Sequence, residues 1–372
     1  MKVCILSMQR VGNFGSLLQG YGLKKMLEDC GHSVSFLDIE PKDEDEQLCF
    51  RMKQKENQSW FRVCSKLKKF DRYVLNRLRI KKLSQKQDAK FQEFRKEFLQ
   101  IEDNTEKDRY DYCVIGSDEV FNCMSETPWG FTSQLFGNVK QADHVITYAA
   151  SCGATTFESL PEAVAERIRK TFENVSAFSV RDENTRKFVS NLSEKKAEIY
   201  LDPVIVSNFD QELENTSLPP GLPKQYCVVY SYYNRISAPE EIRAIQKFCE
   251  KHQMEPIAIG APQMWIKNYP VLDPFQMLKV FQHAQFVVTD TFHGTIFSAK
   301  YVKHFATMTR PSNENKLRDL LGRLQVEKHQ VYSFDELDAV FQIENDVERV
   351  SCLSRAERER TLEYLKQNIQ EL

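Results

Sequence analysis

Short apolar segments alternate with helical patterns along most of this chain of 372 residues. The first apolar segment is followed by a polar loop and then by apolar residues at roughly helical spacing, among them Leu17, Leu18 and Tyr21. This β-α-β alternation favours a parallel sheet with helices on both faces. The strands expected in the first half of the chain are residues 2–8, 33–39, 111–116, 145–151, 177–180 and 197–201.

A break in this alternation divides the chain. Residues 207–225 contain three prolines and a glycine and mark a linker. A second α/β series follows, with strands expected at residues 226–231, 255–260, 286–289 and 304–307. We therefore predict an α/β fold of two Rossmann-like domains, residues 1–206 and 226–350, that face a cleft.

The end of the chain, residues 351–372, is expected to form a helix. Ser354 and Glu357 have the spacing of a capping box, which places the start of the helix near Ser354. Leu362, Leu365 and Ile369 supply its apolar stripe.

Residues 59–100 form an insertion with helical patterns and no strand. It carries thirteen Lys and Arg against four Asp and Glu, interleaved with aromatic and aliphatic residues. A basic amphipathic helix of this kind suits an anionic membrane surface. The same pattern also fits a solvated helix that packs on its domain, so both interpretations stay open.

Composition excludes several classes of protein. The 51 Lys and Arg nearly balance the 53 Asp and Glu, which excludes a strongly basic nucleic-acid binder and an acidic disordered chain. No apolar run approaches the roughly 18–20 residues of a membrane span, and residues 1–10 lack the features of a signal peptide. The ten cysteines are scattered without metal-ligand spacing, so we expect free thiols in a reducing cytoplasm and no metal site.

Loops at the carboxyl ends of the expected strands are the first functional signal, because ligands of open α/β sheets bind there. These loops are rich in Gly, Ser, Thr, Asn and charged residues, although turn chemistry alone accounts for part of this. They are residues 12–16, 117–122, 151–154, 181–182, 232–235, 261–265 and 291–295.

The segment 286–298 is the most informative of these junctions. A buried strand runs into a helix through Asp-Thr-Phe-His-Gly-Thr, and the N–H groups and dipole at a helix start favour an anion. Thr291 and Thr295 add hydroxyl donors, and His293 adds a group that titrates near neutral pH. A histidine at a helix start is often a capping or core residue, but its place at the expected ligand face favours a functional role.

The strand end at residues 111–122 offers acceptor groups. Ser117, Asp118, Glu119 and Asn122 suit sugar hydroxyls, or supply a carboxylate for proton transfer. The alternative is an Asx-type turn that caps the next helix.

A third strand end carries a cation, Arg181. A guanidinium in this place suits a carboxylate or a phosphate. The alternative is a surface salt bridge between Arg181 and either Asp182 or Glu183.

Together these segments resemble the polysaccharide pyruvyl transferase family. The resemblance covers most of the chain and follows the order of the family's motifs, each at an expected strand end. Six matches in order are more specific than any one of them. They are residues 13–15 with 18–21, 114–122, 148–153, 179–182, 201–203 and 289–298.

The resemblance implies a GT-B-like fold and a transfer reaction. A pyruvyl group moves from phosphoenolpyruvate to two hydroxyls of a sugar, forming a pyruvate ketal and releasing phosphate. The sugar belongs to a surface polysaccharide or to its lipid-linked precursor, which would give the basic insertion a purpose at the inner membrane surface. The implied partners are thus phosphoenolpyruvate as co-substrate and this acceptor, in the cytoplasm, with no nucleic acid, cofactor or metal.

The resemblance also implies roles for individual residues. His293 would be the general acid or would stabilise charge at the phosphate, and Asp118 is a weaker candidate for the base. The residues expected to bind the donor are Arg181, Thr291, Gly294 and Thr295. The residues expected to bind the acceptor are Asn13, Gly15, Ser117 and Asn122.

Three positions depart from the family pattern. Glu119 stands where relatives have Gln, and its charge would repel an anionic donor if it faced the cleft. Phe121 replaces Trp and keeps an aromatic ring. Thr291 stands where some members have Arg, so another cation would have to compensate.

Two other functions remain open on the sequence. A GT-B glycosyltransferase that uses a nucleotide-sugar would need the same cleft and anion site. A family member without catalytic activity would bind glycans or partner enzymes. A nicotinamide-dependent dehydrogenase is disfavoured, because no GxGxxG motif follows the first strand.

Overall fold

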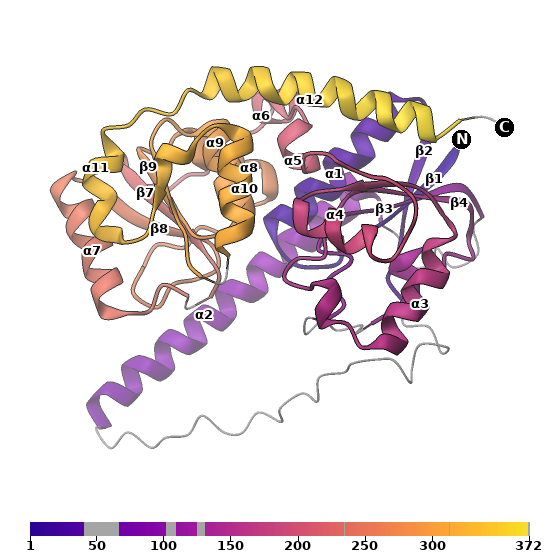
Figure 1. The fold of residues 1–372 in the computed structure, drawn as a ribbon. Helices are drawn as coiled ribbons and strands as arrows, with labels where there is room; N and C mark the ends of the chain where they lie inside the picture. Colours follow the sequence, from indigo (N-terminus) through magenta and orange to yellow (C-terminus); the bar gives the residue numbers. More distant parts are fainter. Residues whose placement is uncertain (41–66, 102–108, 125–130, 234, 312, 371–372) are drawn as a thin grey trace.

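Two parallel sheets lie side by side in the computed structural model of the chain (Figure 1). The structure describes residues 1–40, 67–101, 109–124, 131–233, 235–311 and 313–370, with the backbone alone for residues 67–77 and Asn315. We call each sheet with its helices a lobe. The predicted fold class, two Rossmann-like α/β units, is confirmed.

The N-terminal lobe holds six parallel strands in the order β2-β1-β3-β4-β5-β6. The strands are β1 (Lys2–Leu6), β2 (Ser33–Leu37), β3 (Tyr110–Asp118), β4 (Ala142–Ala150), β5 (Val175–Val180) and β6 (Ala197–Ile199). The helices that follow them include α1 (Phe14–Asp29), α3 (Glu162–Phe172), α4 (Glu183–Ser190) and α5 (Pro203–Val206). All six strands fall where the sequence predicts them.

Successive residues of β1 show why this sheet needs two layers of helices. Val3 and Ile5 pack with the apolar face of α1, whereas Cys4 and Leu6 pack in a second cluster that contains residues of α3 and α4. Side chains alternate between the faces of a strand, so an uninterrupted apolar strand is stable only when both faces are covered.

The C-terminal lobe holds five parallel strands in the order β11-β10-β9-β7-β8. The strands are β7 (Tyr226–Ser231), β8 (Glu255–Gly260), β9 (Phe286–Thr289), β10 (Phe305–Met308) and β11 (Gln330–Val331). Its helices include α7 (Pro239–Lys251), α8 (Pro274–Gln282), α9 (Phe292–Tyr301), α10 (Glu314–Leu324) and α11 (Leu337–Phe341). The sequence did not indicate β11, because two residues are too few for an apolar run.

The segment between the two sheets contains a short helix, α6 (Asp210–Glu214). It is held against the N-terminal lobe at Glu212, which accepts hydrogen bonds from the Tyr21 hydroxyl at 2.7 Å and from Lys25 Nζ at 2.6 Å. Both donors lie on α1, so this connection is anchored by side-chain contacts.

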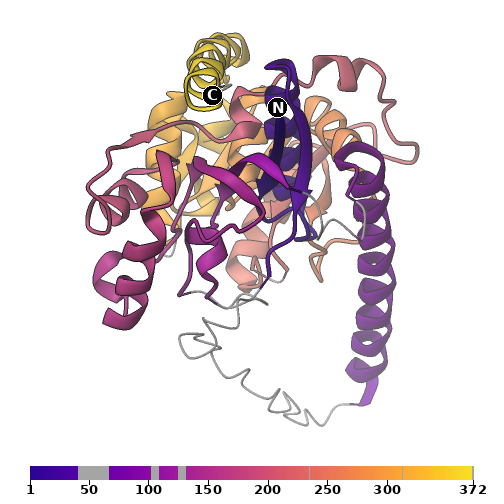
Figure 2. The same cartoon turned by 90° about the vertical axis from the view of Figure 1, so that its right-hand side faces the viewer.

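The basic insertion contains a long helix, α2 (Leu67–Phe94), which runs along one side of the molecule (Figure 2). Its C-terminal half packs on both lobes. The ring of Phe91 lies 4.9 Å from that of Phe14 in the N-terminal lobe, and the Gln87 side chain exchanges hydrogen bonds with the backbone of Leu272 in the C-terminal lobe. This half is therefore a packed helix. Residues 59–66 of the predicted insertion lie outside the described residues, and contact with a membrane stays a prediction.

The last helix, α12 (Val347–Asn368), crosses from the C-terminal lobe to the N-terminal sheet (Figure 1). The predicted start at Ser354 is wrong. Asp346 caps the helix by accepting a hydrogen bond from the Arg349 N–H at 2.9 Å, and Ser354 is buried within it. Near its far end the Tyr364 hydroxyl donates to the Thr147 carbonyl at 2.9 Å, which ties the helix to β4.

No membrane-spanning helix is found among the described residues. In the ranges that the structure describes, every helix is either too short or too polar to cross a bilayer.

Candidate functional site

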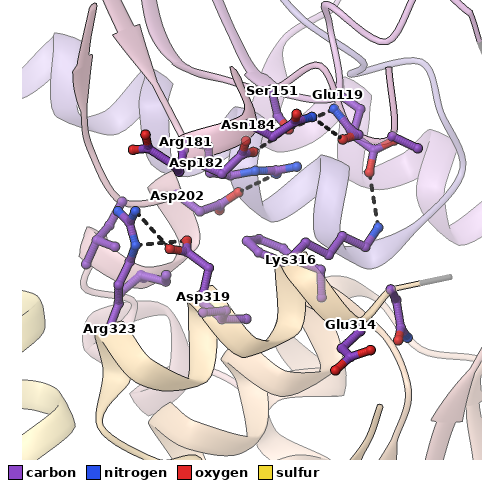
Figure 3. A pocket seen from close by; sticks show the side chains of 18 of the residues that line it. Glu119, Ser151, Arg181, Asp182, Asn184, Asp202, Glu314, Lys316, Asp319 and Arg323 are labelled. Atoms are coloured by element: carbon purple, nitrogen blue, oxygen red, sulfur yellow. Dashed lines mark hydrogen bonds and ion pairs between the residues drawn. The ribbon is translucent and has the colours of Figure 1, made fainter. Parts of the chain in front are cut away.

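A cavity of about 360 Å³ lies between the lobes (Figure 3). Its N-terminal wall is made by residues that directly follow strands β3 to β6. These include Glu119, Ser151, Arg181, Asp182 and Asp202. The structure therefore has a cavity at the carboxyl ends of the strands, where the sequence predicts a ligand site.

The opposite wall comes from the C-terminal lobe. Helix α10 supplies Glu314, Lys316, Asp319 and Arg323, and α9 supplies its first residue, Phe292. In Figure 3 helix α10 lies below the first wall, and Lys316 and Asp319 extend from it into the space between. The cavity is thus completed only when both lobes are in place.

Arg181 is the most buried cation of the cavity. Its side chain is 6% exposed, and Nη1 lies 3.1 Å from Asp202 Oδ2 and 3.9 Å from Asp118 Oδ1. The guanidinium carbon lies 4.4 Å from the centre of the Phe292 ring, which belongs to the other lobe. The two carboxylates offset the cost of burying this charge, and the ring adds a cation–π contact.

Asp202 joins Arg181 to His293. Oδ2 of Asp202 lies 3.1 Å from Arg181 Nη1 and 3.6 Å from His293 Nε2. The carboxylate is fully buried, lines the cavity, and caps α5 by accepting a hydrogen bond from the Val204 N–H at 2.9 Å. A cation of one lobe and an imidazole of the other therefore converge on a single carboxylate oxygen.

The pKa values of these groups follow from this arrangement. Burial by itself would raise the pKa of Asp202, but the hydrogen bond and charge of His293 and the charge of Arg181 outweigh it and hold the pKa below its usual value. For Arg181, burial acts to lower the pKa, and the nearby carboxylates, Asp202 first, raise it above its usual value. Both groups are therefore charged at neutral pH.

Gln19 of α1 completes the contact between the lobes. In the amide orientation that satisfies both its ends, the nitrogen donates to Asp202 Oδ2 at 3.1 Å and lies 3.2 Å from His293 Nε2. The oxygen accepts from the Asp118 N–H at 2.8 Å. Gln19 thus connects both candidate catalytic residues to Asp202.

Asp118 and Asn13 lie together at the start of α1. The Asn13 side chain caps α1 by accepting from the Ser16 N–H at 2.8 Å and donates to Ser16 Oγ at 3.0 Å. Ser16 Oγ then donates to Asp118 Oδ2 at 2.8 Å. Neither Asn13 nor Asp118 lines the cavity, so their predicted roles in binding and catalysis have no support from it.

The chain matches the family model for polysaccharide pyruvyl transferases over residues 13–310, which is about four fifths of its length. The chain belongs to the polysaccharide pyruvyl transferase family. This agrees with the resemblance seen in the sequence and shows a transferase that acts in polysaccharide biosynthesis. The search among curated proteins finds no significant sequence match.

Solved structures of similar overall shape include three UDP-GlcNAc 2-epimerases. The enzyme from Methanocaldococcus jannaschii has 12% identity and a TM-score of 0.48, over 98% of this chain and 100% of that chain. The Neisseria meningitidis enzyme, bound to UDP-GlcNAc, has 11% identity and a TM-score of 0.49 over the same shares. The Rickettsia bellii enzyme has 11% identity and a TM-score of 0.48, over 99% of each chain. Such scores carry no argument about function, and the GT-B-like fold assigned here rests on the two facing parallel sheets.

The helix start that the family motif suggested as an anion site has one of its N–H groups bound by its own cap residue. Thr291 caps α9 by accepting a hydrogen bond from the Gly294 N–H at 3.0 Å. Thr295 is fully buried and donates its hydroxyl proton to the Thr291 carbonyl at 2.9 Å. Thr291, Gly294 and Thr295 are not among the residues that line this cavity, and their role in donor binding stays a prediction.

Two residues predicted to bind the acceptor form hydrogen bonds within the loops. Ser117 is buried and donates to the Ala149 carbonyl at 2.8 Å. Asn122 donates to Glu119 Oε2 at 2.7 Å and accepts from the Thr155 hydroxyl at 2.7 Å. Neither residue lines the cavity, but Asn122 holds the side chain of Glu119, which does.

Glu119, which the sequence analysis singled out as a departure from the expected family pattern, does face the cavity. It pairs across the lobes with Lys316 Nζ at 3.2 Å (Figure 3). Burial acts to raise the pKa of Glu119, but Lys316, Arg181 and the Asn122 hydrogen bond together lower it below its usual value. The carboxylate is therefore ionised and neutralises the cation on the opposite wall.

Sequence reasoning missed three residues of this site. Asp202 and Gln19 lie in segments that resemble the family motifs, but neither was assigned a role. Lys316 lies on α10, two elements after the histidine motif, and only the folded structure places it opposite Glu119.

Proposed function

We propose that the protein transfers a pyruvyl group from phosphoenolpyruvate to a sugar of a surface polysaccharide or of its lipid-linked precursor. The product is a pyruvate ketal, and phosphate is released. One observation carries the proposal beyond family membership: basic residues of both lobes, Arg181 and Lys316, line one cavity whose size suits a small phosphorylated acid and part of a sugar.

The donor's charge explains why cations from both lobes are needed. Phosphoenolpyruvate carries a phosphate and a carboxylate, and guanidinium and ammonium groups are the side chains suited to both. Arg181 is held in place by Asp202 and the Phe292 ring, so little further ordering is required when an anion binds. Lys316 would replace the cation that Thr291 does not supply.

The reaction also needs proton transfer. A proton must reach the methylene carbon of the donor, and each attacking sugar hydroxyl must lose one. We assign this exchange to the Asp202–His293 pair, in which Asp202 faces the cavity and His293 stands directly behind it at 3.6 Å. His293 then acts as the acid through this pair, and Asp118 is the weaker candidate for the base.

The charge of Glu119 affects donor binding in this proposal. Its pairing with Lys316 neutralises a cation that the donor needs. An anionic donor therefore has to displace the Glu119 carboxylate from Lys316, which weakens binding without preventing it.

The deciding experiment measures phosphate release from phosphoenolpyruvate in the presence of lipid-linked oligosaccharide fragments from the source organism. Acceptor-dependent phosphate and a ketal detected by mass spectrometry support the proposal. Parallel reactions with a panel of nucleotide-sugars test the glycosyltransferase alternative. Glycan binding without turnover of any donor, unchanged in His293→Ala, would establish a binding protein and rule the proposal out.

A further inference from the structure

Lys300 is a half-buried lysine on α9 that the reaction described above does not use. Its Nζ donates hydrogen bonds to the carbonyls of Val204 at 2.8 Å, Ile205 at 2.9 Å and Ser207 at 2.7 Å. An ammonium has three N–H donors, and here each has a carbonyl acceptor. Lys300 therefore holds one short stretch of backbone at three points.

This stretch is the end of α5, a helix of a single turn (Pro203–Val206). The last four carbonyls of a helix have no hydrogen-bond partner inside the helix. In a helix of four residues, these are nearly all of its carbonyls. Lys300 satisfies these carbonyls from the other lobe. Burial lowers the pKa of Lys300 to about 7; the charge of Arg358 adds to this, and the charges of Asp210 and Asp202 oppose it. The three carbonyl acceptors also favour the charged form of the side chain.

The start of α5 is Asp202, the carboxylate at the centre of the site. Both ends of α5 are therefore in contact with α9: Asp202 with His293, and the terminal carbonyls with Lys300. Residues 293 and 300 are two helical turns apart and lie on the same face of α9. A shift of α5 along α9 would change both contacts together.

We propose that Lys300 is a positioning residue for Asp202. By holding the end of α5, it fixes the carboxylate at the start of α5 between Arg181 and His293. Its role in catalysis rests on the proposed pyruvyl transfer, whereas the positioning itself does not.

The test therefore uses a readout that needs no substrate. The protein has seven histidines, and ¹⁵N labelling of their rings reports each imidazole by NMR, with His293 assigned from His293→Gln. At pH 6, where Lys300 is charged, we expect Lys300→Met to shift the His293 ring nitrogens by several ppm and to leave the other six histidines unchanged. A merely stabilising role for Lys300 would lower the Tm without moving the His293 signals.

Lys303→Met is the matched control. Lys303 is exposed and pairs only with the surface residue Glu344 at 2.9 Å among the contacts described for it, so its variant should leave the His293 signals in place. If Lys300→Met does not fold, Lys300→Arg replaces it, because a planar guanidinium keeps the charge but cannot direct three N–H groups at three carbonyls around one point. Unshifted His293 signals in whichever variant folds overturn the proposal.

An activity measurement separates this inference from the proposed function. With pyruvyl transfer established, we expect Lys300→Met to lower kcat at least tenfold and to change the KM for phosphoenolpyruvate less than threefold. A kcat equal to that of the wild type would overturn the positioning role. Shifted His293 signals in a protein that never transfers pyruvyl groups would support the positioning and refute the proposed function.

Discussion

Gly15 of α1 lies directly against the imidazole of His293 from the opposite lobe. A Cβ built on Gly15 would stand 2.2 Å from His293 Nδ1, far closer than any real contact between such atoms. The glycine is needed here for close approach between two elements. Gly15 does not line the cavity, and its role in acceptor binding stays a prediction.

A methyl group at this position should therefore displace the imidazole. We expect Gly15→Ala to lower kcat/KM for pyruvyl transfer at least tenfold, about 1.4 kcal/mol of transition-state stabilisation. The protein should still fold, because a side chain at the lobe boundary can move aside. Steady-state kinetics and a thermal melt measure the two effects.

Gly12→Ala is the matched control for this change. A Cβ on Gly12 would meet its nearest neighbours, on Asp88 and Phe91, at 3.6 Å, which is ordinary contact. Its activity should stay within twofold of the wild type. Equal losses in both variants would show that the loop, and not the contact with His293, is responsible.

Glu119→Gln should strengthen donor binding. The change removes a negative charge that is paired with Lys316 at 3.2 Å and keeps the shape of the side chain. We expect the KM for phosphoenolpyruvate to fall about threefold to tenfold, with kcat nearly unchanged, because about 1 kcal/mol is typical of a partly exposed charge pair. Initial rates over a range of donor concentrations measure it.

Glu183→Gln provides the comparison. Glu183 also lines the cavity, but it pairs with Arg186 of its own helix in an exposed position. Removal of the Glu183 charge should change the KM for phosphoenolpyruvate less than twofold. A KM that rises in Glu119→Gln would mean that the carboxylate contributes to binding, and the donor would then not be the anion proposed.

The sequence predicted the sheets better than the site, for a physical reason. Strands such as β7 and β9 are covered on both faces, so they read as continuous apolar runs, and the carboxyl end of each locates a loop. The direction in which a polar side chain points in such a loop depends on contacts from distant elements. The hydroxyl groups of Thr291 and Thr295 form hydrogen bonds within α9, whereas the Glu119 carboxylate points into the cavity and pairs with Lys316.

The grouping of His293 with Arg181 shows the same limit. The family resemblance assigned both residues to the same anionic donor, Arg181 to its binding and His293 to its protonation or charge stabilisation. In the structure a protein carboxylate, Asp202, already lies between them at 3.6 Å and 3.1 Å. The spacing of residues in one chain cannot indicate this, because the three residues come from separate strand ends.

Removal of the Asp202 charge should destabilise the fold. In Asp202→Asn the buried guanidinium of Arg181 loses its nearest carboxylate, and breaking such a pair typically costs about 3 kcal/mol of unfolding free energy. The pKa of Asp202 lies below its ordinary 3.8 in the folded protein, so its contribution is complete above about pH 5 and is lost as the pH falls through the folded value. Urea unfolding of wild type and Asp202→Asn at pH 7 and at pH 3.5 measures the loss of unfolding free energy and its dependence on pH.

The difference between wild type and Asp202→Asn should thus shrink in acid. The control is Asp143→Asn, which removes an exposed partner of Arg109 and should cost less than 1 kcal/mol at either pH. A loss in Asp202→Asn as small as that of the control would contradict the view that Asp202 compensates a buried charge.

A second pH dependence comes from His329, which is 3% exposed in the C-terminal lobe. Its ring stacks on that of Phe305 at 4.2 Å, and Nδ1 donates to the Phe305 carbonyl at 3.0 Å. Burial lowers the pKa of His329 to about 4; the Phe305 carbonyl opposes this, and His304 and Arg349 add to it. The folded protein therefore holds a neutral imidazole where the unfolded chain is already protonated.

This difference makes the fold less stable in mild acid. Between about pH 6.5 and pH 4 the unfolded chain binds one more proton at this position, so unfolding free energy falls by on the order of 3 kcal/mol as the pH is lowered. His329→Gln cannot titrate, and urea unfolding from pH 7 to pH 4 should show that this part of the loss is absent. The exposed residue His283 provides the control, because His283→Gln should lose stability as the wild type does. Parallel losses in all three proteins would show that His329 is protonated in the folded state.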